Sequence, residues 1–295
     1  MSQPAPHLHQ GPTTRGTMLA AAGCLVPAAA WGALVQGPGA LAVLAVAAGA
    51  SLACELAIGL AAWRRFTLAD GSALLTGLLV GLSLPVYVPL FVPAVAAAFA
   101  VAVVKASFGG LGRNWMNPAL GGRLFVTFSW PALLAVRPRP PAGWLRVPAG
   151  LTDGSLLGGS GQLGLVSTLL LALGGAYLLA RRIAAWEVTA SFAASFALTV
   201  CALGGLPAGE GLFRGDLPAA LASGSFALAA FFMATDPVTA PRGRAARLAF
   251  GAGCGLLCFL LRAYARRAEA PFLAVPLMNM LVPLLERPAA RRGRK

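Results

Sequence analysis

The chain has 295 residues, of which 58% are hydrophobic and 11% are charged, whereas soluble domains carry roughly 25% charged residues. This composition excludes a water-soluble globular protein, because a core of this size cannot absorb so much apolar surface. The formal net charge is +14, but the basic residues separate apolar stretches instead of forming a basic face, so the charge indicates membrane topology and not nucleic-acid binding.

Apolar stretches recur along the whole chain, and several approach or exceed the roughly 20 residues that cross the hydrocarbon layer as a helix. We therefore predict an all-α polytopic protein of the lipid bilayer with about ten transmembrane segments. In chain order, the predicted segments are 18–35, 39–63, 70–84, 86–104, 119–135, 163–180, 187–206, 218–234, 247–261 and 270–285.

The connections between these segments carry an uneven charge. The side of the membrane that holds both termini collects fifteen Lys and Arg residues, and the opposite side collects seven. The positive-inside rule therefore predicts that both termini are cytoplasmic. The chain then divides into a cytoplasmic tail 1–16, a single transmembrane domain 17–286 with an outer-face loop 137–161, and a basic cytoplasmic tail 287–295.

Two short segments resemble each other. Residues 71–78 and residues 224–231 share a Gly-Ser start and similar apolar spacing, and each stretch runs on to two prolines. Five segments separate the two copies, and an odd number inverts one copy relative to the other. We predict a 5+5 inverted repeat with short broken helices, an arrangement with which transporters build a site near the membrane midplane. Chance similarity in a sequence rich in Ala, Gly and Leu is the alternative.

The acidic residues number only nine, so a carboxylate inside a segment is informative. Glu55 lies nine residues before Arg64, which places it roughly 13 Å deep along a helix. A carboxylate at that depth is costly unless it is protonated, paired or hydrated. Glu55 is therefore a candidate for an ion path, and a structural pairing with Arg123 or with a backbone group is the alternative.

Asp70 and Asp236 lie at corresponding ends of the two related segments. Asp70 precedes its segment, where a carboxylate caps a helix start. Asp236 follows its segment, where a carboxylate opposes the helix dipole. Asp236 is the second ion-path candidate, and a pairing with Arg242 is the simpler alternative.

The remaining motifs predict no metal site and no nucleotide site. Cys254 and Cys258 are one helical turn apart, but no second pair completes a set of four ligands. The glycine-rich stretch 109–112 follows no strand and leads into no Gly-Lys-Ser/Thr sequence, as a phosphate-binding loop would. The residues that follow it still offer donors for an anion; these are Arg113, Asn114 and Asn117.

Four motifs occur in order along the chain. They are Asp-Gly-Ser at 70–72 with the following 73–78, Phe-Gly-Gly-Leu-Gly at 108–112 with Asn-Pro-Ala at 117–119, Phe-Met-Ala-Thr-Asp-Pro-Val-Thr-Ala-Pro at 232–241, and the asparagine-centred 277–284. Together they resemble a known family, the D subunits of Rnf-type ion-translocating electron-transport complexes, which are relatives of the B subunits of sodium-pumping NADH:quinone oxidoreductases. The resemblance runs from about residue 17 to residue 288.

The resemblance implies a multi-pass protein of the bacterial cytoplasmic membrane that works with the other subunits of a ferredoxin/NAD-type oxidoreductase. It also implies FMN, joined by a phosphoester to a threonine of the outer-face loop, and coupling of electron transfer to Na+ or H+ transport. The family threonine closes a Ser-Gly-Ala-Thr motif, and the matching residues here are Thr-Asp-Gly-Ser at 152–155. Ser155 is thus the candidate FMN site.

The substitution at Ser155 leaves three outcomes open. FMN is attached to the serine hydroxyl, FMN is held without a covalent bond, or the protein carries no flavin and acts as a scaffold in the same complex. Asp153 would place a negative charge next to the phosphate, which disfavours the covalent bond. A cofactor-free channel or secondary transporter is the alternative function for the whole chain.

Overall fold

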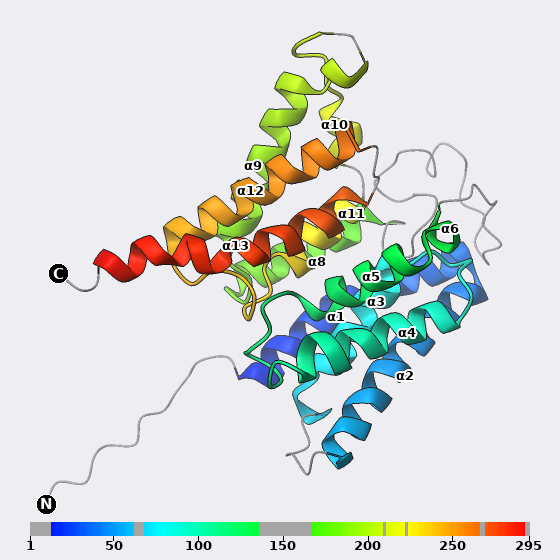
Figure 1. Cartoon of the computed structure of the whole chain (residues 1–295). Helices are drawn as coiled ribbons and strands as arrows, with labels where there is room; N and C mark the ends of the chain where they lie inside the picture. Colours follow the sequence, from blue (N-terminus) through cyan, green and yellow to red (C-terminus); the bar gives the residue numbers. More distant parts are fainter. Residues whose placement is uncertain are drawn as a thin grey trace, which may run out of the picture.

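The computed structural model describes residues 13–61, 68–135, 167–208, 211–221, 224–265 and 269–292. Within these ranges the chain is helical and forms no strand (Figure 1), so the all-α prediction is confirmed there. Four helices are long and apolar enough to cross a membrane: Thr14–Gln36, Pro38–Ala61, Trp186–Leu203 and Arg244–Ala263. Shorter apolar helices are Ser72–Ser83, Phe91–Ala106, Thr168–Ala180 and Ala270–Glu286. The total of about ten crossings stays a prediction.

The first half of the chain forms a group of packed helices, drawn in blue to green in Figure 1. Its elements are α1 (Thr14–Gln36), α2 (Pro38–Ala61), η1 (Leu68–Asp70), α3 (Ser72–Ser83), α4 (Phe91–Phe99), the π-helical η2 (Ala100–Ala106), α5 (Pro118–Ser129) and α6 (Pro131–Leu134). Gly77 allows α3 to approach α2 closely, because a Cβ at this position would lie 2.6 Å from the Cα of Ala48. The hydroxyl of Ser51 on α2 donates a hydrogen bond to the carbonyl of Ala73 on α3.

The second half of the chain forms the group drawn in yellow-green to red. Its elements are α8 (Thr168–Ala180), α9 (Trp186–Leu203), η4 (Leu206–Ala208), α10 (Leu217–Leu221), α11 (Gly224–Leu228), the π-helical η5 (Ala229–Met233), α12 (Arg244–Ala263) and α13 (Ala270–Arg292). Glycines at 251 and 255 bring α12 against the backbone of α9. Cys254 and Cys258 are free thiols buried on α12.

The two related segments contain different described elements. The segment 218–234 contains α10 and the contiguous α11 and η5, and the segment 70–84 contains the 12-residue helix α3. In η5 the amide of Ala234 bonds to the carbonyl of Ala229, five residues earlier, as in a π-helix. The hydroxyl of Thr189 on α9 donates to the carbonyl of Ala230, 3.0 Å away.

Two side chains of α5 and its cap, in the first half, contact the second half. Asn117 Nδ2 donates to the carbonyl of Met233 at the end of η5, at 3.3 Å. Arg123, only 1% exposed, forms an ion pair with Glu269, which immediately precedes α13. The guanidinium also lies over the ring of Phe272, 5.8 Å from its centre. Helix α5 is therefore fixed to both halves of the molecule.

Candidate functional site at the junction of the two halves

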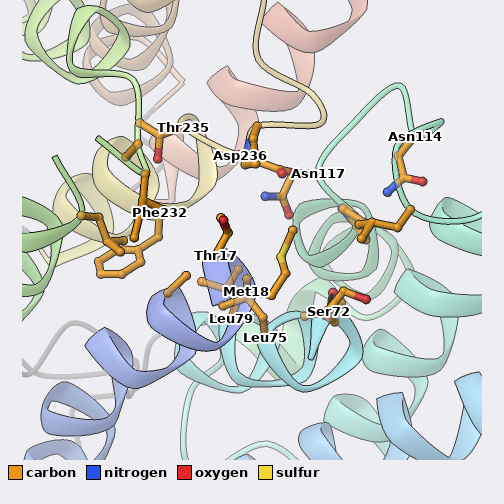
Figure 2. Close-up of a pocket in the computed structure, with 18 of the residues that line it drawn as sticks. Thr17, Met18, Ser72, Leu75, Leu79, Asn114, Asn117, Phe232, Thr235 and Asp236 are labelled. Atoms are coloured by element: carbon orange, nitrogen blue, oxygen red, sulfur yellow. Dashed lines mark hydrogen bonds between the residues drawn. The ribbon is translucent and has the colours of Figure 1, made fainter. Parts of the chain in front are cut away.

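A cavity of about 60 Å³ lies at the junction of the two halves (Figure 2). That volume admits a few water molecules or a small ion. Its walls come from the beginnings of α1, α3 and α5 and from the ends of η2, α8 and η5. Residues at these six ends that line the cavity are Thr17, Ser72, Asn117, Lys105, Leu178 and Asp236.

The helix ends around the cavity are those that would share one side of the membrane if successive segments cross it in alternating directions. If successive segments cross in opposite directions, the beginnings of segments 1, 3 and 5 and the ends of segments 4, 6 and 8 share one side. Those are the ends that meet around the cavity. In the predicted topology this side is cytoplasmic.

The lining combines an apolar wall with converging polar groups. The apolar residues include Met18, Leu75, Leu79, Phe231 and Phe232. The polar residues include hydroxyls, two asparagines, one ammonium group and one carboxylate. These side chains are Thr17, Ser72, Thr76, Thr235, Asn114, Asn117, Lys105 and Asp236. An apolar cavity with a few placed polar groups is typical of a binding site.

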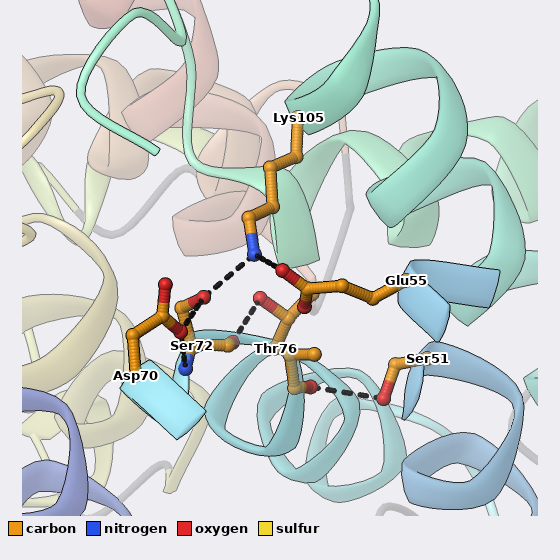
Figure 3. Close-up of polar contacts among 7 residues, drawn as sticks. Ser51, Glu55, Asp70, Ser72, Thr76 and Lys105 are labelled. Carbon is orange, nitrogen blue, oxygen red and sulfur yellow. Dashed lines mark hydrogen bonds and ion pairs between the residues drawn. The ribbon is translucent and has the colours of Figure 1, made fainter. Parts of the chain in front are cut away.

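Lys105 occupies the π-helical η2 and is the partner of Glu55. Its Nζ donates to Glu55 Oε1 at 2.7 Å and to the hydroxyl oxygen of Ser72 at 2.6 Å (Figure 3). Lys105 is 4% exposed and Glu55 is 6% exposed. The alternative that paired Glu55 with Arg123 is therefore wrong, since Arg123 instead pairs with Glu269.

Asp70 extends this polar chain to the beginning of α3. Its Oδ1 accepts hydrogen bonds from the hydroxyl and from the backbone amide of Ser72, the first residue of α3. The N-cap position itself is Gly71 and not Asp70, so the predicted cap is displaced by one residue. Gly71 between them has φ of 77°, a left-handed conformation that favours glycine. The continuous contacts run from Asp70 through Ser72 and Lys105 to Glu55.

Asp236, the second ion-path candidate, lies in the turn after η5 and lines the cavity directly. Its carboxylate accepts the amide of Val238 at 3.2 Å and the hydroxyl of Thr239 at 3.3 Å. Arg242 does not supply these bonds, and its backbone amide donates instead to Glu286. Burial raises the pKa of Asp236 to about 6, although both hydrogen bonds lower it.

Asn114 and Asn117 follow the glycine-rich turn, and both are buried, but they differ in their hydrogen bonds. Asn117 Oδ1 accepts the amides of Ala119 and Leu120 and so caps α5. Asn114 is 6% exposed, lines the cavity, and has no hydrogen-bond partner for either amide atom among the residues that the structure describes. A buried side chain in this state requires an explanation, and an occupant of the cavity is one. Arg113, the third predicted donor, is exposed.

The sequence identifies Glu55 and Asp236 as site residues but not Lys105. A basic residue at the end of an apolar stretch is typical of a membrane boundary, so Lys105 resembles a topology signal. Its pairing with Glu55 joins residues 50 positions apart, and no local pattern predicts such a contact. Ser155 and the loop 137–161 lie outside the described residues.

Comparison with known proteins gives consistent matches. A family model described as the NQR2, RnfD, RnfE family matches residues 1–294. The D subunit of the Na+-translocating ferredoxin:NAD+ oxidoreductase complex of Acetobacterium woodii is 32% identical, over 96% of this chain and 91% of that protein. The D subunit of the proton-translocating complex of Clostridium ljungdahlii is 31% identical, over 96% and 92%. The B subunit of the Na+-translocating NADH-quinone reductase of Pseudoalteromonas atlantica is 33% identical, over 63% and 51%.

Proposed function

Because the chain belongs to the NQR2, RnfD, RnfE family, we propose that it is the D-type membrane subunit of a ferredoxin:NAD+ oxidoreductase complex. In this function it assembles with the other subunits in the bacterial cytoplasmic membrane and helps couple electron transfer to the transport of Na+ or H+. The chemistry at the electron donor and at NAD+ belongs to partner subunits.

One observation carries the coupling role: the two ion-path candidates, found independently in the sequence, converge on one cavity. Asp236 lines the cavity directly, and Glu55 reaches it through Lys105. Charged groups inside membrane proteins are costly and mark ion or proton pathways. Around them, the hydroxyl and amide oxygens of the cavity wall suit a hard cation or a chain of water molecules.

The choice between Na+ and H+ is left to experiment. Two relatives of nearly equal identity, 32% and 31%, are named for Na+ and for protons respectively. Overall similarity therefore does not separate the two ions.

The coupling role is tested with the purified complex in proteoliposomes supplied with reduced ferredoxin and NAD+. We expect NADH formation to generate a membrane potential, reported by a voltage-sensitive dye. Omission of Na+ abolishes the potential if Na+ is transported, and the potential persists without Na+ if H+ is transported. NADH formation without any potential would refute the coupling role. Solute movement without an electron donor would instead support a channel or secondary transporter.

We further propose that the protein carries FMN, with Ser155 in the loop 137–161 as the candidate residue for its attachment. When bound, FMN supplies a carrier that accepts and passes on electrons. The hydroxyl of Ser155 would hold its phosphate, since phosphoester formation requires an alcohol in an accessible segment of small residues.

Flavin attachment is tested by expressing the protein with its flavin transferase and examining a denaturing gel for flavin fluorescence. We expect a fluorescent band in the native protein and in Ser155→Thr, and loss of the band in Ser155→Ala. Ser160→Ala, in the same loop, is the matched control and should keep the band. A band that persists in Ser155→Ala contradicts the attachment site, and flavin released on denaturation indicates non-covalent binding.

A further inference from the structure

We infer that Arg123 is a fixed positive barrier that prevents the passive flow of cations between the cavity and the outer side of the membrane. The inference rests on the proposed function, because a subunit that couples electron transfer to ion transport must be closed to passive flow. It names the residue that keeps the protein closed.

Arg123 lies a short distance beyond the cavity. It follows Asn117, which lines the cavity and caps α5, by six residues, or about 9 Å along the helix axis. Its partner Glu269 immediately precedes α13, and the beginning of that segment faces the outer side in the predicted topology. Since the hydrocarbon layer is about 30 Å thick, the protein that separates the cavity from the beginning of α13 is much thinner than the membrane.

The two charges of this ion pair differ in exposure. The side chain of Arg123 is 1% exposed, whereas that of Glu269 is 18% exposed. The guanidinium also lies over the ring of Phe272, so an apolar wall covers one of its faces. Because a guanidinium remains charged in proteins, the buried member of the pair carries a permanent positive charge.

Other buried polar atoms without partners lie along the same two helices. Nε and Nη1 of Arg123 have no hydrogen-bond partner within the described part of the chain, and neither do the two amide atoms of Asn279 on α13, which is 2% exposed. Helices α5 and α13 pack against each other and run in opposite directions (Figure 1). Asn279, two turns after Phe272 on the same face, therefore lies roughly level with Asn117. Buried polar groups in this state require an explanation, and a polar route past Arg123 is one.

A permanent positive charge on such a route repels cations. Charges act strongly on one another in an interior of low dielectric constant, and an arginine side chain can exclude cations and protons from a membrane pore. Glu269 does not reverse this effect, because its carboxylate is already paired with the guanidinium. The route is then closed to Na+ and H+ by charge, although its walls are polar.

The barrier is tested by the passive uptake of cations into proteoliposomes that contain the whole complex but neither ferredoxin nor NAD+. A potassium diffusion potential, negative inside, drives uptake, and radioactive Na+ and an internal pH dye report it. We expect the native complex to add little to the leak of protein-free liposomes. The double variant Arg123→Gln with Glu269→Gln removes both charges and keeps polar side chains, and it should raise the leak severalfold. Arg123→Lys retains the positive charge and should stay closed.

The matched control removes a different ion pair. Arg247→Gln with Glu187→Gln disrupts a pair with a nitrogen-to-oxygen distance of 3.8 Å between α12 and α9, and it should leave the leak at the native level. An equal leak in this control would overturn the barrier, because the leak would then report general destabilisation. A leak at the native level in the double variant at Arg123 and Glu269 would also overturn it.

A second variant covers the case in which that double variant fails to assemble. Arg123→Gln alone leaves Glu269 with part of its surface exposed, and a leak at the native level in this single variant would likewise overturn the barrier. The measurement needs no electron donor, so its outcome is separate from the test of coupling. A native complex that forms NADH without a membrane potential refutes the proposed function, whereas equal leaks in the native complex and the Arg123 variants refute the barrier alone.

Discussion

Asn114 and Asn117 lie three residues apart, and substitutions at the two positions should affect different properties of the protein. A change at Asn114 should affect ion transport, and a change at Asn117 should affect stability. Replacing Asn114 with Leu removes a buried amide that has no partner in the described structure, so the protein should lose no stability and can gain some. We expect Asn114→Leu to keep its melting temperature in detergent but to lower the ion transport of the complex in proteoliposomes.

Asn117→Ala is the matched comparison at the same turn. It loses the cap of α5 and the bond to Met233, and loss of a cap costs about 1 kcal/mol. The melting temperature should therefore fall in this variant. An Asn114→Leu protein that melts early and transports normally would contradict the role assigned to Asn114.

At the scale of elements, the contact between α9 and α12 depends on the absence of side chains. A Cβ at Gly251 would overlap the hydroxyl of Ser191 and the carbonyl oxygen of Val188. We expect Gly251→Ala to destabilise the protein by about 1–3 kcal/mol, the typical cost of overpacking. The measurement is thermal unfolding of the purified protein in detergent.

Gly49→Ala in α2 is the control for Gly251→Ala. Apart from its chain neighbours and the backbone of its own helix, no described residue has an atom within 4 Å of a Cβ at position 49. Alanine gains up to about 1 kcal/mol over glycine in a helix. The two variants should therefore shift the melting temperature in opposite directions. Equal shifts would show that helix propensity, and not the contact with α9, governs Gly251.

The long helices could be predicted from the sequence, but the contacts of the short segments could not. Apolar length alone locates α2, which covers Pro38–Ala61 against a predicted 39–63. The π-helical η5 has a distant partner, because the hydroxyl of Thr189 donates to the carbonyl of Ala230. The local amino-acid composition does not predict a contact between residues that are 41 positions apart. The inverted repeat also stays a prediction, supported by a similar bond from Ser51 of α2 to Ala73 of α3.

The candidate site could be predicted in part, because the sequence reveals unusual residues but not the partners against which they pack. Glu55 and Asp236 stand out in the sequence because carboxylates are rare in apolar segments. Arg123 was the wrong partner for Glu55, since spacing along the chain does not reveal which helices pack together. Asn114 is recognisable as a donor from its place after a glycine turn, but its lack of a partner in the described structure is a property of the folded chain.

At the scale of the whole molecule, the predicted topology has a direct test. Both termini should be cytoplasmic and the loop 137–161 should face outward. We expect a fluorescent protein fused after Lys295 to be fluorescent and alkaline phosphatase inserted in the loop to be active. A reversed pattern would contradict the topology and place the cavity on the outer side.

The attachment of α5 to both halves constrains how the protein can move. Toward the first half, a Cβ at Gly122 would overlap the carbonyl of Ala96, and the rings of Phe99 and Phe125 stack at 4.1 Å. Toward the second half, α5 is held by the bond from Asn117 to Met233 and by the buried ion pair of Arg123. Rocking of one half against the other would disrupt one of these contacts. If the protein couples electron transfer to ion transport as proposed, we expect the coupling to proceed through rearrangement of side chains while the helices stay nearly stationary.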